Sequence, residues 1–199
     1  MNTLTPRERF IEATIKLVAQ MGMENLRTKH IATEVGMSEG SLFAYFKTKE
    51  DILRESFYVA DKRFSDIMLE DPDVRSGNVT PENFRQVASN VWHRCFRYLI
   101  EHPEETLFTI RYRYSAYYTR EVRSQRQAFN GSFAKSYEMI DRLFTETDNF
   151  YRGFFVNYAF ELTLSFAEKI ITGFIADTKE TEERMWRAIG HACLELLEN

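Results

Sequence analysis

The sequence predicts an all-α protein of about nine helices. Its 199 residues include only 8 glycines and 4 prolines, too few turn-forming residues for a protein of many strands. Helix-capping residues recur ahead of apolar residues at helical spacing, and no stretch keeps the strict alternation that is typical of a half-buried strand. We therefore expect long helices joined by short loops.

Composition narrows the class of protein further. The chain is 44% hydrophobic and 28% charged, with a formal net charge of −4, as in ordinary globular proteins. No uncharged apolar run approaches the ~20 residues that a membrane span needs. No basic segment followed by an apolar one opens the sequence, so we expect no membrane partner and a cytoplasmic location. Cys95 and Cys193 form no paired motif, and we expect both to be inert.

Strong signals mark the first helix. Thr5 can cap it, Pro6 suits the first helical position, and Glu8 can complete a capping box. Apolar residues then recur at helical spacing as far as Met21, and Gly22 can end the helix.

Two short helices follow, separated by three residues that begin with a glycine. The first fits residues 28–35, and the second begins at the Ser38 cap and turns Leu42 and Phe46 inward. This arrangement is typical of a helix-turn-helix, in which one helix lies against the DNA backbone and the other lies in the major groove. An ordinary short surface helix is the alternative interpretation.

Caps and breakers also mark the later helices. Thr48 and Asp51 can cap a long fourth helix that extends through Phe64. Beyond it we expect a polar loop at 71–78, helices that begin near Pro81 and Pro103, a break near Thr119, a kink at Asn130-Gly131, and two last helices that begin after Asp148 and after Asp177-Thr178.

Small residues lie on the expected outer face of the third helix. Gly40 and Ala44 permit close approach to base edges. They are poor choices for a helix that only faces solvent, because glycine costs about 1 kcal/mol relative to alanine without a compensating contact.

A long pattern runs through this region: Ile31-Ala32-x-x-x-Gly36-Met37-Ser38-x-Gly40-x-Leu42-Phe43-x-Tyr45-Phe46-x-x-Lys49-x-x-Ile52-Leu53. With the rest of residues 10–54 it resembles the DNA-binding head of the tetracycline-repressor (TetR) family. The resemblance implies a ligand-responsive transcriptional regulator, usually a repressor, that binds a palindromic operator as a homodimer and is released by a small-molecule effector. It also implies a helix-turn-helix DNA-binding domain at residues 1–50 and a larger helical ligand-binding and dimerisation domain at residues 51–199.

The resemblance implies contacts with double-stranded DNA at particular positions. Bases would meet Glu39, Gly40, Ser41 and Ala44, the groove would hold Phe43 and Tyr45, and phosphates would meet Thr28, Lys29, Lys47 and Lys49. For Lys49 the alternative is a pair with nearby acidic residues of the free protein.

Physical chemistry gives these residues separate tasks. Lysines and helix N-terminal amides attract phosphates and set the register of the protein on DNA. Sequence preference is then expected from Ser41, from Glu39 as acceptor for a cytosine amino group, and from Ala44 or Phe43 against a thymine methyl. For Glu39 the alternative is a helix N-terminal carboxylate with no role in DNA binding.

Aromatic residues are concentrated in the larger domain, where an apolar or aromatic effector could bind. The candidate lining residues are Trp92, Phe96, Tyr112, Tyr137, Phe155 and Tyr158, and plain core packing is the alternative for each. Glu161 interrupts an apolar stretch and needs a partner there. That partner is a ligand amine, one of Arg111 and Arg113, or a residue of the second subunit.

An apolar stripe near the end of the sequence predicts the dimer interface. Together with the helix from Phe150 to Phe174, it would form a four-helix contact across a two-fold axis. The stripe consists of Met185, Trp186, Ile189, Cys193, Leu196 and Leu197.

The sequence lacks the motifs that an enzyme of this size would need. It has no Glu-x-x-His metal motif, no glycine-rich phosphate loop and no nucleophile elbow. We expect neither catalysis nor a metal or other cofactor. A helical scaffold or adaptor without DNA binding is the alternative function, and a duplex-binding assay separates it from a regulator.

Overall fold

The computed structural model describes residues 4–129 and 149–191. Over these residues the chain forms ten helices and no strand, which confirms the predicted all-α class. The chain divides into two compact units that we describe separately. Unit 1 comprises Met1–Lys62 and Glu104–Phe129, and unit 2 comprises Arg63–Pro103 and Asn130–Asn199.

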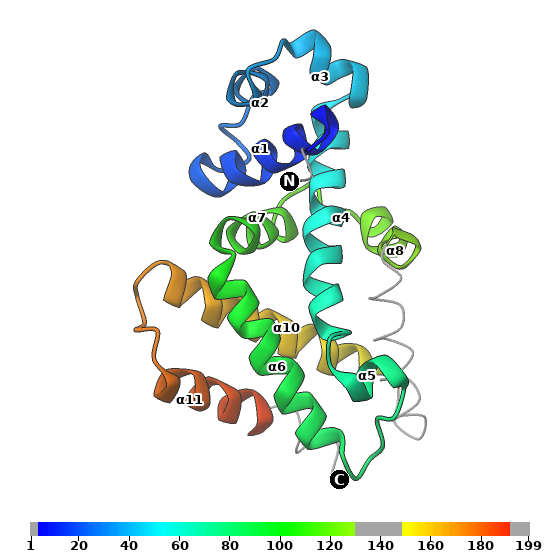
Figure 1. Ribbon diagram of the computed structural model, residues 1–199, viewed down its shortest axis with the longest axis vertical. Helices are drawn as coiled ribbons and strands as arrows, with labels where there is room; N and C mark the ends of the chain where they lie inside the picture. The colour runs from blue at the N-terminus through cyan, green and yellow to red at the C-terminus, as the bar shows by residue number, and fades with distance from the viewer. Residues whose placement is uncertain (1–3, 130–148, 192–199) are drawn as a thin grey trace. The chain divides into compact units, whose positions relative to one another are not determined.

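Unit 1 is built around the first half of one long helix. The short helices α1, α2 and α3 gather at the N-terminal end of α4 (Figure 1), and α1 packs against both α2 and α3. A single core of buried side chains, including Phe10, Leu42, Phe57 and Tyr112, joins these helices to α7. The elements of this unit are α1 (Pro6–Met21), α2 (Thr28–Val35), α3 (Glu39–Tyr45), the start of α4 (Lys49–Met68), α7 (Pro103–Arg113) and α8 (Arg120–Phe129).

Local capping explains where these helices begin. The Thr5 side chain accepts a hydrogen bond from the Glu8 backbone N–H, and the Glu8 carboxylate accepts one from the Thr5 backbone N–H. Ser38 caps α3, and Thr48 forms the same reciprocal pair with Asp51 at the start of α4. Each of these starts was predicted from the sequence.

Unit 2 contains the end of α4 with α5 (Pro72–Ser76), α6 (Phe84–Glu101), α10 (Asn149–Ile171) and α11 (Lys179–Ile189). Helix α6 packs against α10 and α11 (Figure 1). In its core the rings of Trp92 and Phe96 stack with centroids 4.6 Å apart, and the Trp92 indole N–H donates to the Thr163 hydroxyl at 2.9 Å.

Two boundaries differ from prediction in unit 2. The expected polar loop at 71–78 contains α5, because the Asp71 carboxylate accepts from the backbone N–H groups of Asp73 and Val74. Helix α6 begins at Phe84 and not at Pro81, since the Asn83 side chain accepts from the Thr80 N–H and closes a turn there. The expected kink at 130–131 lies outside the described residues.

The packing groups residues differently from the predicted division after residue 50. Unit 1 takes in α7 and α8 as well as the helix-turn-helix. The Tyr112 ring of α7 stacks on Phe57 of α4, with centroids 4.7 Å apart. The division into a DNA-binding domain at residues 1–50 and a ligand-binding and dimerisation domain at residues 51–199 concerns function, and it stays a prediction.

Three chemical features of the described residues bear on function. No described helix is long and apolar enough to cross a membrane. Over the same residues, no group of three or more histidine, cysteine or acidic side chains is placed to hold a metal ion. Cys95 is a free, buried thiol, and burial raises its pKa to about 12, which keeps it protonated and unreactive. Cys193 lies outside the described range.

Candidate nucleic-acid interface

Helices α2 and α3 form the helix-turn-helix that the sequence predicts. Helix α2 ends at Gly36, whose φ of 71° is left-handed and therefore suits glycine. The turn leads directly to the Ser38 cap of α3. Leu42 is fully buried, and Phe46, directly after α3, is 1% exposed. The inner face of α3 therefore belongs to the core of unit 1, which fixes its outer face.

The outer face of α3 carries the residues expected to meet DNA. Phe43 and Tyr45 are 47% and 44% exposed, which is unusual for large aromatic side chains. Gly40 and Ala44 are also exposed on this helix. A Cβ atom added at Gly40 would meet only the Ser38 hydroxyl, at an ordinary 3.7 Å, so packing within the protein does not require glycine here.

Thr28 and Glu39 form a hydrogen bond across the helix-turn-helix. The Thr28 hydroxyl donates to Glu39 Oε1 at 2.7 Å and so ties the start of α2 to the start of α3. The resemblance places the two residues at a phosphate and at a base, and the structure brings them together. Their pairing was not predicted, since they are far apart in sequence and on different helices.

The candidate phosphate-binding lysines differ in their surroundings. Lys29 and Lys47 are exposed. Lys49 is half-buried, and its ammonium donates to the Met23 carbonyl at 2.9 Å, so its partner is the backbone and not an acidic side chain. Burial lowers its pKa. An ammonium has three N–H donors, so the phosphate contact of Lys49 stays a prediction.

The candidate ligand-binding residues are not gathered in one unit. Tyr112 belongs to the core of unit 1 and is 1% exposed, whereas Trp92 and Phe96 belong to the core of unit 2. In unit 2, Tyr158 is 40% exposed and Glu161 is half-buried. Tyr137 and the side chain of Phe155 lie outside the described residues.

The arginines considered as partners of Glu161 have partners within unit 1. Arg111 donates to the Val18 carbonyl, and Arg113 donates to the Tyr118 hydroxyl at 3.2 Å. The Arg113 guanidinium also lies over the Tyr118 ring.

A cavity of about 470 Å³ lies within unit 1. Tyr112 contributes to its wall, and the other candidate ligand-binding residues do not. The cavity is bounded instead by α4, α8 and the segment between α7 and α8. Sequence reasoning missed it because its walls come from segments that are distant in the chain.

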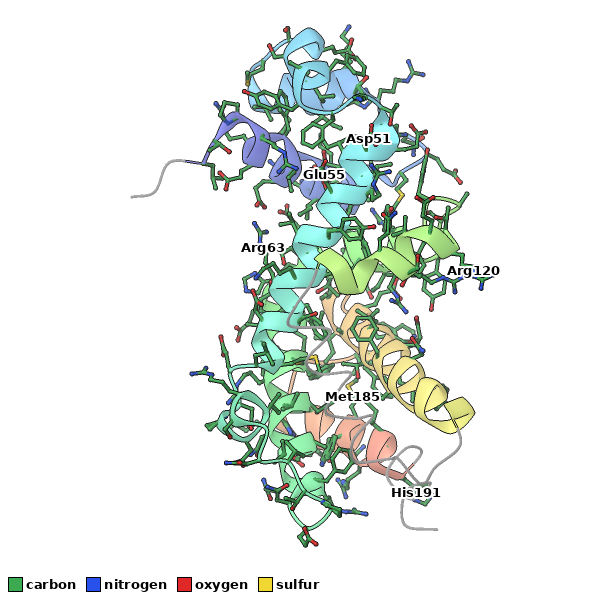
Figure 2. The ribbon with its side chains drawn as sticks, turned by 90° about the vertical axis from the view of Figure 1, so that its right-hand side faces the viewer. Asp51, Glu55, Arg63, Arg120, Met185 and His191 are labelled. Carbon is green, nitrogen blue, oxygen red and sulfur yellow. The ribbon has the colours of Figure 1, made fainter. Side chains whose placement is uncertain are left out.

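The apolar stripe of α11 packs within its own chain. Met185 lies on α11 (Figure 2). In the single protomer it is 5% exposed, and Ile189 is 3% exposed. The Trp186 ring lies 5.5 Å from that of Trp92 on α6. Met185 and Ile189 are therefore buried within the protomer and Trp186 contacts α6, while the dimer interface itself stays a prediction. The remaining members, Cys193, Leu196 and Leu197, lie outside the described residues.

Comparisons with known proteins bear on both the helix-turn-helix and the whole fold. Residues 10–56 match the family model of the bacterial regulatory proteins of the tetR family. The fatty acid metabolism regulator protein of Bacillus subtilis is 34% identical over 61 residues, which are 31% of each chain. An uncharacterized HTH-type transcriptional regulator of Haemophilus influenzae is 27% identical over 48% of each chain. The chain thus matches a third to a half of the length of these curated relatives.

Solved structures match over nearly the full length. A TetR family transcription regulator from Marinobacter aquaeolei is similar with a TM-score of 0.73 at 21% identity, covering 94% of each chain. FadR from Bacillus subtilis, solved in complex with stearoyl-CoA, is similar with a TM-score of 0.65 at 19% identity over 96% of each chain. The chain therefore has the fold of the TetR-family regulators, and its helix-turn-helix region, residues 10–56, is similar to the tetR family of bacterial regulatory proteins.

Proposed function

We propose that the protein is a transcriptional regulator that represses by binding a palindromic operator as a homodimer. The observation that carries this proposal is the outer face of α3, where Gly40 and Ala44 leave room for base edges and two aromatic side chains are exposed. A helix with this face, capped by Ser38 after a glycine turn, suits entry into a major groove. Its buried face explains why the orientation is fixed.

A small-molecule effector completes the proposal. The similarity to a regulator solved with stearoyl-CoA supports a ligand with a large apolar part. The aromatic core of unit 2, including Trp92 and Phe96, supplies the chemistry for such a ligand. Effector binding releases DNA, the protein acts in the cytoplasm, and catalysis has no part in this function.

The homodimer is proposed to form through α10 and α11. Because Met185 and Ile189 are buried within the protomer, the contact uses the outer faces of these helices. Tyr158 on α10 and Ala188 on α11 are exposed there.

Selection of duplexes from a random pool tests the proposal. We expect recovery of a palindrome whose half-sites lie about one helical turn, ~34 Å, apart. A site that binds a cooperative pair of such dimers would agree equally well. Complexes should contain an even number of protomers. A pool that shows no enrichment after repeated rounds would support the helical scaffold instead.

A further inference from the structure

The cavity in unit 1 lies beside the helix that follows the helix-turn-helix. Glu50 and Arg54 on the first turns of α4 form one wall. Tyr117 and Thr119 from the segment between α7 and α8 form another, with Glu121 and Gln125 on α8. The volume of about 470 Å³ is within the range of small-molecule sites, roughly 300–1,000 Å³.

The charges on these walls favour a cation. Two carboxylates, Glu50 and Glu121, face one guanidinium, that of Arg54. That guanidinium is already paired with Asp51 Oδ1 at 2.5 Å, and Asp51 does not line the cavity. The carboxylates therefore outweigh the positive charge that Arg54 can offer to an occupant.

Hydrogen bonds hold one of these carboxylates in place. The Gln125 amide donates to Glu121 Oε1 at 3.0 Å. The Gln125 carbonyl oxygen in turn accepts from the hydroxyl of Tyr58, a buried side chain of α4, at 3.4 Å. A carboxylate oriented in this way is prepared to accept from an ammonium group.

The rest of the wall favours an organic occupant. Tyr112, Tyr117, Ala116 and Val122 supply aromatic and apolar surface, and an aromatic face also attracts cations. Among the described residues, no group of three or more histidine, cysteine or acidic side chains is placed to hold a metal ion. We propose that this cavity is a binding site for a small organic amine with an apolar body.

Occupation of this site should also act on DNA binding, a consequence that rests on the proposed function. Helix α3 ends at Tyr45 and α4 begins at Lys49, so the wall that carries Glu50 follows the DNA-facing helix after a three-residue link. An amine that joins Glu50 on α4 to Glu121 on α8 changes the freedom of α4 within unit 1. By linkage, amine and DNA then alter each other's affinity by the same factor.

A charge series tests the site without DNA. The full chain is titrated by calorimetry with 4-phenylbutylamine, 4-phenylbutanol and 4-phenylbutyrate, which share one apolar body. We expect the amine to bind at least about tenfold more tightly than the alcohol, and the carboxylate to bind most weakly. Equal affinities for the three compounds would contradict the proposal.

Variants locate the binding. Glu50→Gln combined with Glu121→Gln should abolish the preference for the amine, whereas Glu24→Gln, which changes an exposed carboxylate outside the cavity, should preserve it. Ala116→Trp fills the cavity and should block all three compounds even if the double variant fails to fold. Unchanged amine binding in Ala116→Trp places the binding elsewhere and overturns the proposal.

A second arm measures DNA affinity with and without saturating 4-phenylbutylamine. We expect a change of at least about fivefold that Ala116→Trp removes. A DNA affinity that the amine does not change would contradict the coupling between amine binding and DNA binding. The existence of the amine site would then be decided by calorimetry alone. If the protein prefers no duplex sequence, the proposed function is contradicted. The calorimetric titration, which uses no DNA, still tests the amine site.

Discussion

The Thr28 hydroxyl donates a 2.7 Å hydrogen bond to the Glu39 carboxylate and so links the two helices of the helix-turn-helix at their N-terminal ends. The single hydroxyl proton of Thr28 is used in this bond, so in the free protein its side chain can offer a phosphate no donor. The same bond holds Glu39 at the first turn of α3 and uses only one of its two carboxylate oxygens, Oε1. Thr28 thus orients a residue that is expected to read a base.

Thr28→Val tests this relationship, because valine keeps the shape of threonine and removes the hydroxyl. We expect discrimination at the base pair that Glu39 contacts to fall by about 0.5–1.5 kcal/mol, roughly two- to tenfold, as for one hydrogen bond. The measurement compares dissociation constants for the selected duplex and its single-base variants. Thr33→Val, an exposed change on the same helix, serves as control. If Thr28→Val weakens binding equally for the selected duplex and all its single-base variants, Thr28 contacts the DNA backbone and does not orient Glu39.

Lys47 and Lys49 should separate binding from stability. Lys47 is exposed, so Lys47→Ala should lower the slope of log affinity against log salt by about 0.9 for each phosphate that the variant no longer neutralises, and should leave unfolding unchanged. Lys49→Met removes the donor to the Met23 carbonyl and should lower the free energy of unfolding by about 1 kcal/mol. Salt titrations and urea unfolding of both variants check this. A stable Lys49→Met protein with a reduced salt slope would restore Lys49 to a purely phosphate-binding role.

Arg97 should make the stability of unit 2 depend on acid pH. Its guanidinium donates to both carboxylate oxygens of Asp177 and holds the pKa of that group below its ordinary value of 3.8. A lowered folded-state pKa gives stability that is present above pH 3.8 and is lost as the pH falls through the folded pKa. Because the pair is well exposed, we expect only about 0.2–1 kcal/mol.

Arg97→Met should therefore cost most above pH 4 and progressively less below it, as followed by thermal unfolding across pH. Arg184→Met removes an exposed pair with Glu180 on α11 and is the matched control. A cost for Arg97→Met that is the same at pH 3 and pH 6 would show that Asp177 is not the group responsible.

Helix α11 offers substitutions that separate folding from dimerisation. Ile189→Asp places a charge at a site that is 3% exposed within the protomer and should cost several kcal/mol of unfolding free energy. Ala188→Arg changes an exposed neighbour and should weaken the dimer while leaving the helical circular dichroism unchanged. Sedimentation velocity measures the oligomer. A stable dimer in Ala188→Arg places the interface on another surface.

Local signals were sufficient to predict much of the fold. Thr5, Ser38 and Thr48 cap helices through hydrogen bonds to residues three positions ahead, so the sequence alone contains both partners. The short helix α5 was missed, although Asp71 and Pro72 are ordinary starting residues, because five residues give no readable apolar period.

Long-range contacts could not be predicted in the same way. An apolar period identifies the buried face of a helix and does not identify what covers it. Met185 and Ile189 fit a dimer stripe by spacing, and in the structure they pack within the chain. Lys49 finds its partner at Met23, 26 positions away. The cavity at Glu50 and Glu121 likewise depends on segments that only the folded chain brings together.

The proposed function requires that the outer face of α3 reads bases, and the sharpest test compares the wild-type protein with Ser41→Arg on one random duplex pool. Ser41 lies on α3 with its hydroxyl 2.9 Å from that of Ser38, and it makes no large contribution to the core. We expect a palindrome for the wild-type protein and, for Ser41→Arg, a changed preference confined to symmetric positions of the two half-sites, with guanine favoured there. Identical preferences for the two proteins, or changes scattered without symmetry, would show that this face does not read the operator.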